Sequence, residues 1–118
     1  PRVYSGASAI AAIEEMDGKN LGFVLITDKK NVLLGILTDG DVRRLIRKGR
    51  TFNGTAVNDI MTTSPKTIDE SASVAQAIET MQRHEITTLV VISEKKRLKG
   101  YVHLHDMLGR GGSLKISV

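Results

Sequence analysis

The residue types best suited to hold a ligand lie within Gly35–Asp41, where a predicted strand ends and a predicted helix begins. A helix N-terminus presents unpaired backbone N–H groups and the positive end of its dipole, and both attract phosphate. The Thr38 hydroxyl can donate to a phosphate or ribose oxygen, and the Asp41 carboxylate can accept from both hydroxyls of a ribose. Arg44, one turn further on, adds positive charge. The same pattern also fits a simple N-cap at Thr38 with a favourable dipole interaction at Asp41.

A second stretch, Gly100–Asp106, has the same order of residues but carries His103 where the first has threonine. Histidine is a poorer cap than threonine, yet Asp106 keeps the place of the aspartate. His103 and His105 would share a face of a strand but diverge on a helix, and the predicted strand ends between them. We therefore expect them to be hydrogen-bonding or pH-sensitive groups beside a ligand, and we expect no metal site.

Catalytic motifs are absent from the sequence. It contains no Gly-rich phosphate loop ending in Lys-Ser/Thr, no G-x-S-x-G elbow and no H-E-x-x-H. It also contains no cysteine, which excludes disulfides and thiolate metal ligands. We expect that this chain alone is not an enzyme and needs no cofactor.

The chain is basic, with a net charge of +4 at pH 7 and a pI near 9.6. Five basic residues fall within eight positions: Arg43, Arg44, Arg47, Lys48 and Arg50. The aromatic residues that single-strand binding usually requires are not interleaved with them, so a solvated helix face is expected and a nucleic-acid partner is not. No apolar run approaches the roughly 18 residues that a membrane span needs, so we expect no membrane association and a cytoplasmic location.

An internal repeat determines the architecture. Shifted by 65 residues, the sequence overlays itself without a gap from Val3 to Asp41. The identical residues at this offset include Ala7, Ser8, Ala12, Ile13, Glu14, Met16, Lys30, Leu33, Gly35 and Asp41. Two copies are too few for a solenoid, so they predict a pair packed face to face about a pseudo-twofold axis.

Each copy is predicted to have the order β-α-β-β-α, which gives an α/β (α+β) fold. The apolar stripe of the first helix contains Ala9, Ile13 and Met16, and its counterpart contains Val74, Ala77, Ile78 and Met81. Ser73 and Gln76 have the spacing of a capping box. The predicted strands of the two copies are Arg2–Tyr4, Phe23–Ile26 and Val32–Leu37, then Lys66–Ile68, Leu89–Ile92 and Leu98–His103. The second helices are predicted to begin near Asp39 and Leu104.

The repeat boundaries predict residues 1–50 as the first copy, 51–56 as a linker and 57–118 as the second copy. The second copy opens with a lead-in, Val57-Asn58-Asp59-Ile60-Met61-Thr62. At the 65-residue offset the matching lead-in would precede Pro1. We therefore expect the chain to be part of a longer protein.

The doubled β-α-β-β-α pattern, the lead-in and the G-x-x-T-x-x-D stretch together resemble a tandem pair of CBS domains, also called a Bateman module. Such pairs bind adenine nucleotides or related ligands in clefts between the repeats. The resemblance implies that Thr38 and Asp41 hold phosphate and ribose, whereas the second copy matches this pattern only at Asp106. Together with the residues argued above, the predicted nucleotide-binding set is Thr38, Asp41, Arg44, His103, His105, Asp106, Thr67 and Thr88.

The stretches Gly35–Asp41 and Gly100–Asp106 resemble, more specifically, the C-terminal regulatory CBS pair of bacterial D-arabinose-5-phosphate isomerases. In that family a preceding sugar-isomerase (SIS) domain performs the catalysis, and its product feeds synthesis of Kdo for lipopolysaccharide and capsule. The likeness implies a nucleotide or CMP-Kdo as ligand, and as partners an SIS domain of the same chain and a second copy of the protein. Two alternatives stay open here: a structural dimerisation clamp, and a free-standing CBS protein.

Overall fold

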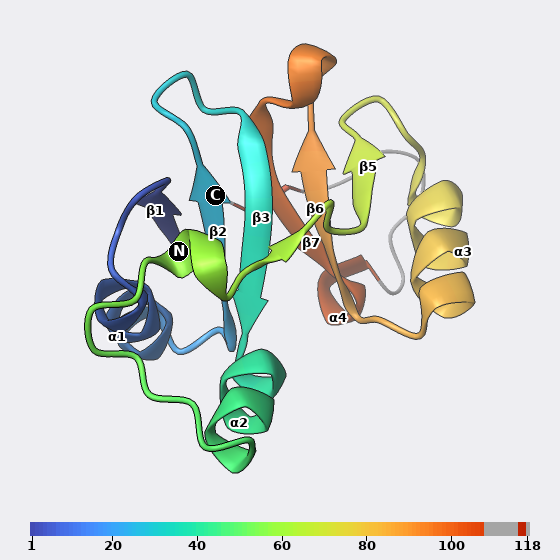
Figure 1. Cartoon of the computed structure of the whole chain (residues 1–118). Coiled ribbons are helices and arrows are strands. Elements are labelled where there is room, and N and C mark those ends of the chain that lie inside the picture. Colours follow the sequence, from blue (N-terminus) through green and yellow to red (C-terminus); the bar gives the residue numbers. More distant parts are fainter. Residues whose placement is uncertain (108–115, 118) are drawn as a thin grey trace. The chain divides into compact units, whose positions relative to one another are not determined.

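The computed structural model describes residues 1–107 and 116–117, and the chain divides into two compact units, Pro1–Pro65 and Lys66–Val118 (Figure 1). The elements of the first unit are β1 (Arg2–Tyr4), α1 (Ala9–Lys19), β2 (Phe23–Thr27), β3 (Leu33–Thr38), α2 (Asp39–Arg47), the 3-10 turn η1 (Val57–Asp59) and β4 (Thr62–Thr63). Those of the second are β5 (Thr67–Asp69), α3 (Val74–His84), β6 (Thr88–Ile92), the 3-10 turn η2 (Glu94–Lys96), β7 (Leu98–His103) and α4 (Leu104–Met107). The predicted order, β-α-β-β-α twice, is confirmed, and strand ends differ from the prediction by one residue at most.

The sheet of the first unit has the order β1-β2-β3-β4. β2 lies inside it, parallel to β1 and antiparallel to β3. All five β2 residues are buried, which explains why its sequence is a continuous apolar run rather than an alternating one. The last of them, Thr27, is fully buried, and its Oγ1 has no hydrogen-bond partner among the described residues.

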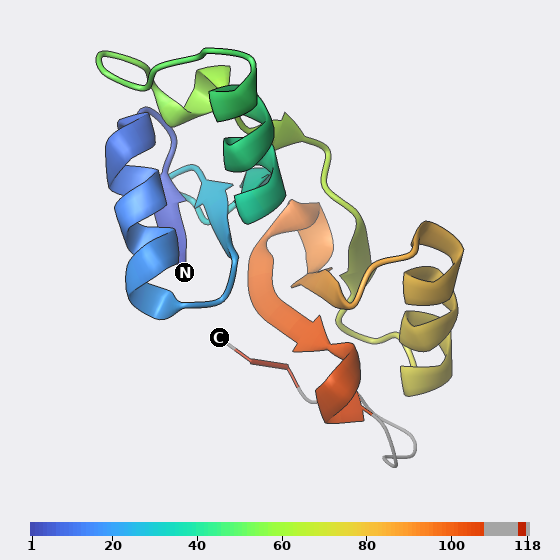
Figure 2. The same ribbon diagram turned by 90° about the horizontal axis from the view of Figure 1, so that it is seen from below.

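Helix α1 runs alongside β1 and β2 and covers the core of the first unit (Figure 2). It begins at the N-cap Ser8, whose hydroxyl accepts from the Ala11 N–H at 3.0 Å. It ends at Asn20, which adopts the left-handed conformation common after a helix. The predicted stripe is confirmed, because Ala9 and Met16 are buried against Val24, Ile26 and Leu37.

The lead-in segment packs with the first unit, although the repeat boundary assigns it to the second copy. Val57 and Ile60 are buried in the first core. The Val57 N–H donates to the Ala7 carbonyl at 2.8 Å, and Asn58 Oδ1 accepts from the Gly6 N–H at 2.7 Å. β4 then pairs with β3 and completes the sheet. The folded unit therefore extends through Pro65.

Gly35 lies where β4 approaches β3 closely. A Cβ placed on Gly35 would lie 2.7 Å from Met61 Sδ and 2.8 Å from the Thr62 carbonyl oxygen. The second unit repeats this arrangement, because a Cβ on Gly100 would overlap the Ser117 carbonyl oxygen, and Ser117 is bridged to Tyr101. A side chain at either glycine would force the two strands apart.

The second unit builds its core on the same plan, with the sheet order β5-β6-β7. The predicted capping box is confirmed: Ser73 Oγ accepts from the Gln76 N–H at 3.1 Å, and Gln76 Oε1 accepts from the Ser73 N–H at 2.8 Å. Ala77 and Met81 of α3 are buried in its core, as their stripe predicts. Each unit thus has its own apolar core, and the packing of the two repeats about a pseudo-twofold axis stays a prediction.

Candidate functional site

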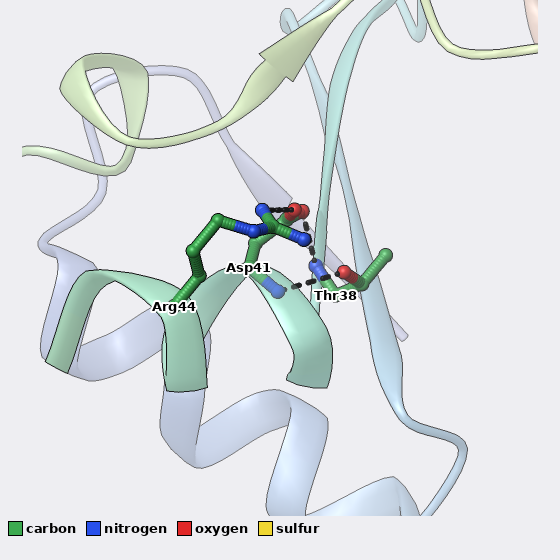
Figure 3. A network of polar contacts seen from close by, with 3 residues as sticks. All are labelled: Thr38, Asp41 and Arg44. Atoms are coloured by element: carbon green, nitrogen blue, oxygen red, sulfur yellow. Dashed lines mark hydrogen bonds and ion pairs between the residues drawn. The ribbon is translucent and has the colours of Figure 1, made fainter. Parts of the chain in front are cut away.

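Thr38 and Asp41 meet where β3 ends and α2 begins (Figure 3). Thr38 Oγ1 accepts from the Asp41 N–H, and Asp41 Oδ2 accepts from the Thr38 N–H, each at 3.1 Å. This reciprocal pair is a capping box, which satisfies two backbone donors at the helix start. The first α2 turn also holds Asp39 and Asp41, whose negative charge is favourable at the positive end of the helix dipole.

Arg44 completes a three-residue network. Its Nη1 donates to Asp41 Oδ1 at 3.0 Å, so both oxygens of the carboxylate have a donor. The Asp41 side chain is 17% exposed and that of Arg44 is 56% exposed. The sequence predicted Arg44 as a source of charge for a ligand and missed its pairing with Asp41, although the i,i+3 spacing was the available signal.

These bonds leave the site able to bind further groups. Each carboxylate oxygen has two lone pairs, so Asp41 can keep its present donors and still accept from ligand hydroxyls. The Thr38 oxygen accepts from the backbone, and its O–H proton is still available to donate. The cap and the ligand site, which the sequence presents as alternatives, are therefore compatible in one geometry.

The second unit forms the corresponding turn with an imidazole. His103 Nδ1 accepts from the His105 N–H two residues on, at 3.3 Å, whereas the Thr38 hydroxyl of the first unit accepts from the N–H three residues on. In a neutral imidazole, an Nδ1 that accepts a hydrogen bond leaves Nε2–H as the donor of the ring. His103 is thus a cap as well as a candidate ligand residue.

The remaining predicted residues lie at the same end of the second sheet as His103. Thr88 stands opposite His103 in the β6–β7 register, and Thr67 pairs with Val90 on the other side of β6. Asp106 is exposed in the short α4 and makes no hydrogen bond or ion pair with residues 1–107 or 116–117. The structure therefore brings Thr88 and His103 together and leaves Asp106 unpaired within the part of the chain that it describes.

A polar groove outside this set lies between β5 and α3, with a volume of about 590 Å³. Asp69 lines it, and hydrogen bonds from the Ser71 hydroxyl and the Ser71 N–H lower the pKa of that carboxyl below its ordinary value. None of the predicted site residues lines the groove.

The described residues form neither a metal cluster nor a membrane-spanning helix. No three His, Asp or Glu side chains lie together there in a way that would hold a metal ion. In the same part of the chain, no helix combines the length and the apolar character that crossing a membrane requires.

Comparison with known proteins identifies the family. A family model for the CBS domain matches residues 1–48 and again residues 57–111. The chain belongs to the CBS-domain family. A solved CBS domain protein from Pyrobaculum aerophilum, complexed with AMP, superimposes with a TM-score of 0.80 at 19% identity, over 92% of this chain and 83% of that one. This likeness confirms the fold of a CBS pair.

Two relatives of the chain are arabinose 5-phosphate isomerases. Arabinose 5-phosphate isomerase KdsD of Pseudomonas aeruginosa is 34% identical over 111 residues, which is 94% of this chain and 34% of that protein. KdsD of Francisella tularensis is 38% identical over 98 residues, which is 82% of this chain and 29% of that protein. The chain thus spans about a third of the length of the relatives it matches.

Proposed function

We propose that this CBS pair is the regulatory, ligand-sensing part of a D-arabinose-5-phosphate isomerase. Its ligand would be an adenine nucleotide or a nucleotide sugar such as CMP-Kdo. The observation that carries the proposal is the Thr38–Asp41 pair, a hydroxyl and a carboxylate held together at a helix start in the stretch that the family uses for phosphate and ribose. The similarity to two KdsD isomerases supports the choice of parent enzyme.

In this proposal the catalytic work belongs to an SIS domain that precedes the CBS pair. That domain interconverts ribulose 5-phosphate and arabinose 5-phosphate for Kdo, and thereby for lipopolysaccharide or capsule synthesis in the cytoplasm. The CBS chain alone would isomerise nothing. Its partners would be the SIS domain, a second copy of itself and the nucleotide, with no nucleic acid or membrane and no resident cofactor.

Titration calorimetry with AMP, ATP, CMP and CMP-Kdo tests the ligand. A ligand that binds only the folded chain stabilises it by about 2.7 kcal/mol at one hundred times its dissociation constant, so a thermal shift must accompany each calorimetric signal. Saturable binding with such a shift supports the proposal. The absence of binding by all four compounds would contradict it.

Asp41→Ala tests the location of the site. Loss of charge-assisted hydrogen bonds to a ribose should weaken binding at least tenfold. The structure shows that the same change also removes half of a capping box, so about 0.5–2 kcal/mol of stability should be lost with it. Gln76→Ala is the matched control, because it removes the same half of the capping box of α3. It should cost similar stability and leave affinity unchanged.

A structural dimerisation clamp is the second candidate. The observation in its favour is that Thr38, Asp41 and Arg44 already satisfy one another without a ligand. If Asp41→Ala and Gln76→Ala both lower stability and neither alters any binding, the clamp becomes the better account. Its own test is sedimentation of the chain at micromolar concentration, where a clamp must sediment as a dimer.

A further inference from the structure

We infer that Arg44 is a positioning residue for the nucleotide site. It holds the Asp41 carboxylate in the orientation that accepts hydrogen bonds from ribose hydroxyls, and it does not act by contacting the phosphate. This inference rests on the proposed function and names the residue that makes the first repeat selective for a ribonucleotide.

The geometry of the network supports this role. The Thr38 N–H, at the end of β3, binds Asp41 Oδ2 at 3.1 Å, and Arg44, one turn along α2, binds Oδ1 at 3.0 Å. Two donors from different elements on different oxygens fix the plane of the carboxylate, whereas the Thr38 donor alone leaves it free to rotate about that one bond (Figure 3). A carboxylate that is already oriented loses less conformational freedom when a ligand binds. The affinity of the site for a ribonucleotide is higher for that reason.

The exposure of the pair separates this role from simple stabilisation of the helix. Arg44 is 56% exposed, and an ion pair whose arginine is this exposed to solvent contributes little to stability. The guanidinium is engaged with the carboxylate and needs no ligand as a partner. Removing it should therefore change the binding of ribose hydroxyls more than it changes folding.

The second repeat lacks this arrangement. At the 65-residue offset Asp41 becomes Asp106, and Arg44 becomes Gly109, which lies outside the described residues. A glycine cannot orient a carboxylate through a side chain. At residue 109 the second repeat therefore has no side chain that could take the place of Arg44.

A thermodynamic cycle provides the test. The affinities of wild type and Arg44→Met are measured by calorimetry for AMP and CMP and for their 2′-deoxy forms. Arg44→Met should weaken binding of the ribonucleotides about three- to tenfold, which is the lower part of the range found for coupled groups in one hydrogen-bond network. It should weaken the 2′-deoxy forms by less, because one of the two ribose hydroxyls that can bind the carboxylate is missing.

Arg83→Met is the matched control. Arg83 is a helical arginine with 60% exposure, paired with Glu79 at 2.8 Å in α3 of the second unit. It should leave all four affinities unchanged.

Three outcomes would overturn the inference. Equal losses for ribo and deoxy forms would mean that Arg44 binds the phosphate, and unchanged affinities with a lower melting temperature would mean that it only supports α2. If the wild type binds none of the four nucleotides, the proposed function falls and this inference falls with it. If the wild type binds a nucleotide but Arg44→Met affects its ribo and deoxy forms equally, only this inference falls and the proposed function stands.

Discussion

Replacing Thr27 by valine should stabilise the first unit. Thr27 is fully buried at the end of β2, and its Oγ1 has no hydrogen-bond partner among the described residues. Burial of a hydroxyl without a partner costs about 1–3 kcal/mol, because the group gives up its hydrogen bonds to water. Valine has nearly the same shape and the same branching at Cβ, so it fits the strand without repacking.

The internal repeat supports this substitution. The counterpart of Thr27 at the 65-residue offset is Ile92, which ends β6 as Thr27 ends β2. Both residues follow a register shift in the pairing with the next strand. An apolar β-branched side chain is therefore compatible with this position of the fold.

Thr27→Val should raise the free energy of unfolding by about 1–2 kcal/mol, the lower part of the cost of an unpaired hydroxyl. For a unit of this size each kcal/mol corresponds to a melting-temperature change of about 4–8 °C. Urea and thermal denaturation measure both quantities. Thr27→Ser is the control, because it keeps the hydroxyl and loses one methyl, so it should destabilise by about 1 kcal/mol. A loss of stability in Thr27→Val would refute the reasoning, since it would show that the hydroxyl has a partner.

Three further predictions concern other parts of the chain. Gly35→Ala should destabilise by about 1–3 kcal/mol in thermal denaturation, because its Cβ would overlap β4; Gly18→Ala, in open space on α1, should stabilise by about 0.4–1 kcal/mol. Val57→Ala should cost about 2 kcal/mol and accelerate amide exchange in β2 more than in β6, whereas equal acceleration would place Val57 outside the first core. Ser71→Ala should raise the pKa of Asp69 in an NMR titration, and the stability that the lowered pKa provides is lost as pH falls through the folded-state value; an unchanged titration would contradict this.

The sequence predicted most of the fold because apolar spacing and capping residues are local signals. Ser73 and Gln76, or the run that forms β2, can be recognised without knowing what packs against them. The packing of Val57 and of β4 with the first unit could not be predicted in this way, because chain order does not say which core such a segment covers or which sheet it joins. Thr27 gave no signal either, since only the packed structure shows that its hydroxyl is buried without a partner.

The sequence predicted which residues form the candidate site better than it predicted the hydrogen bonds between them. Thr38 and Asp41 were expected as a cap or as ligand groups, and the structure establishes the cap. The pairing of Arg44 with Asp41 was missed, because the helical spacing that allows it is equally compatible with an arginine that binds a ligand. The cap at His103 was harder to foresee, because histidine is seldom an N-cap and its accepting nitrogen depends on the tautomer.

The packing of residues 57–65 with the first unit has a consequence for protein engineering. The repeat in the sequence and the folded unit end at different residues. A domain boundary chosen by sequence similarity would therefore divide the apolar core of the first unit. A transplant or fusion joined at residue 56 would separate Val57 and Ile60 from the apolar residues that they cover. A junction after Pro65 would instead fall between the two compact units.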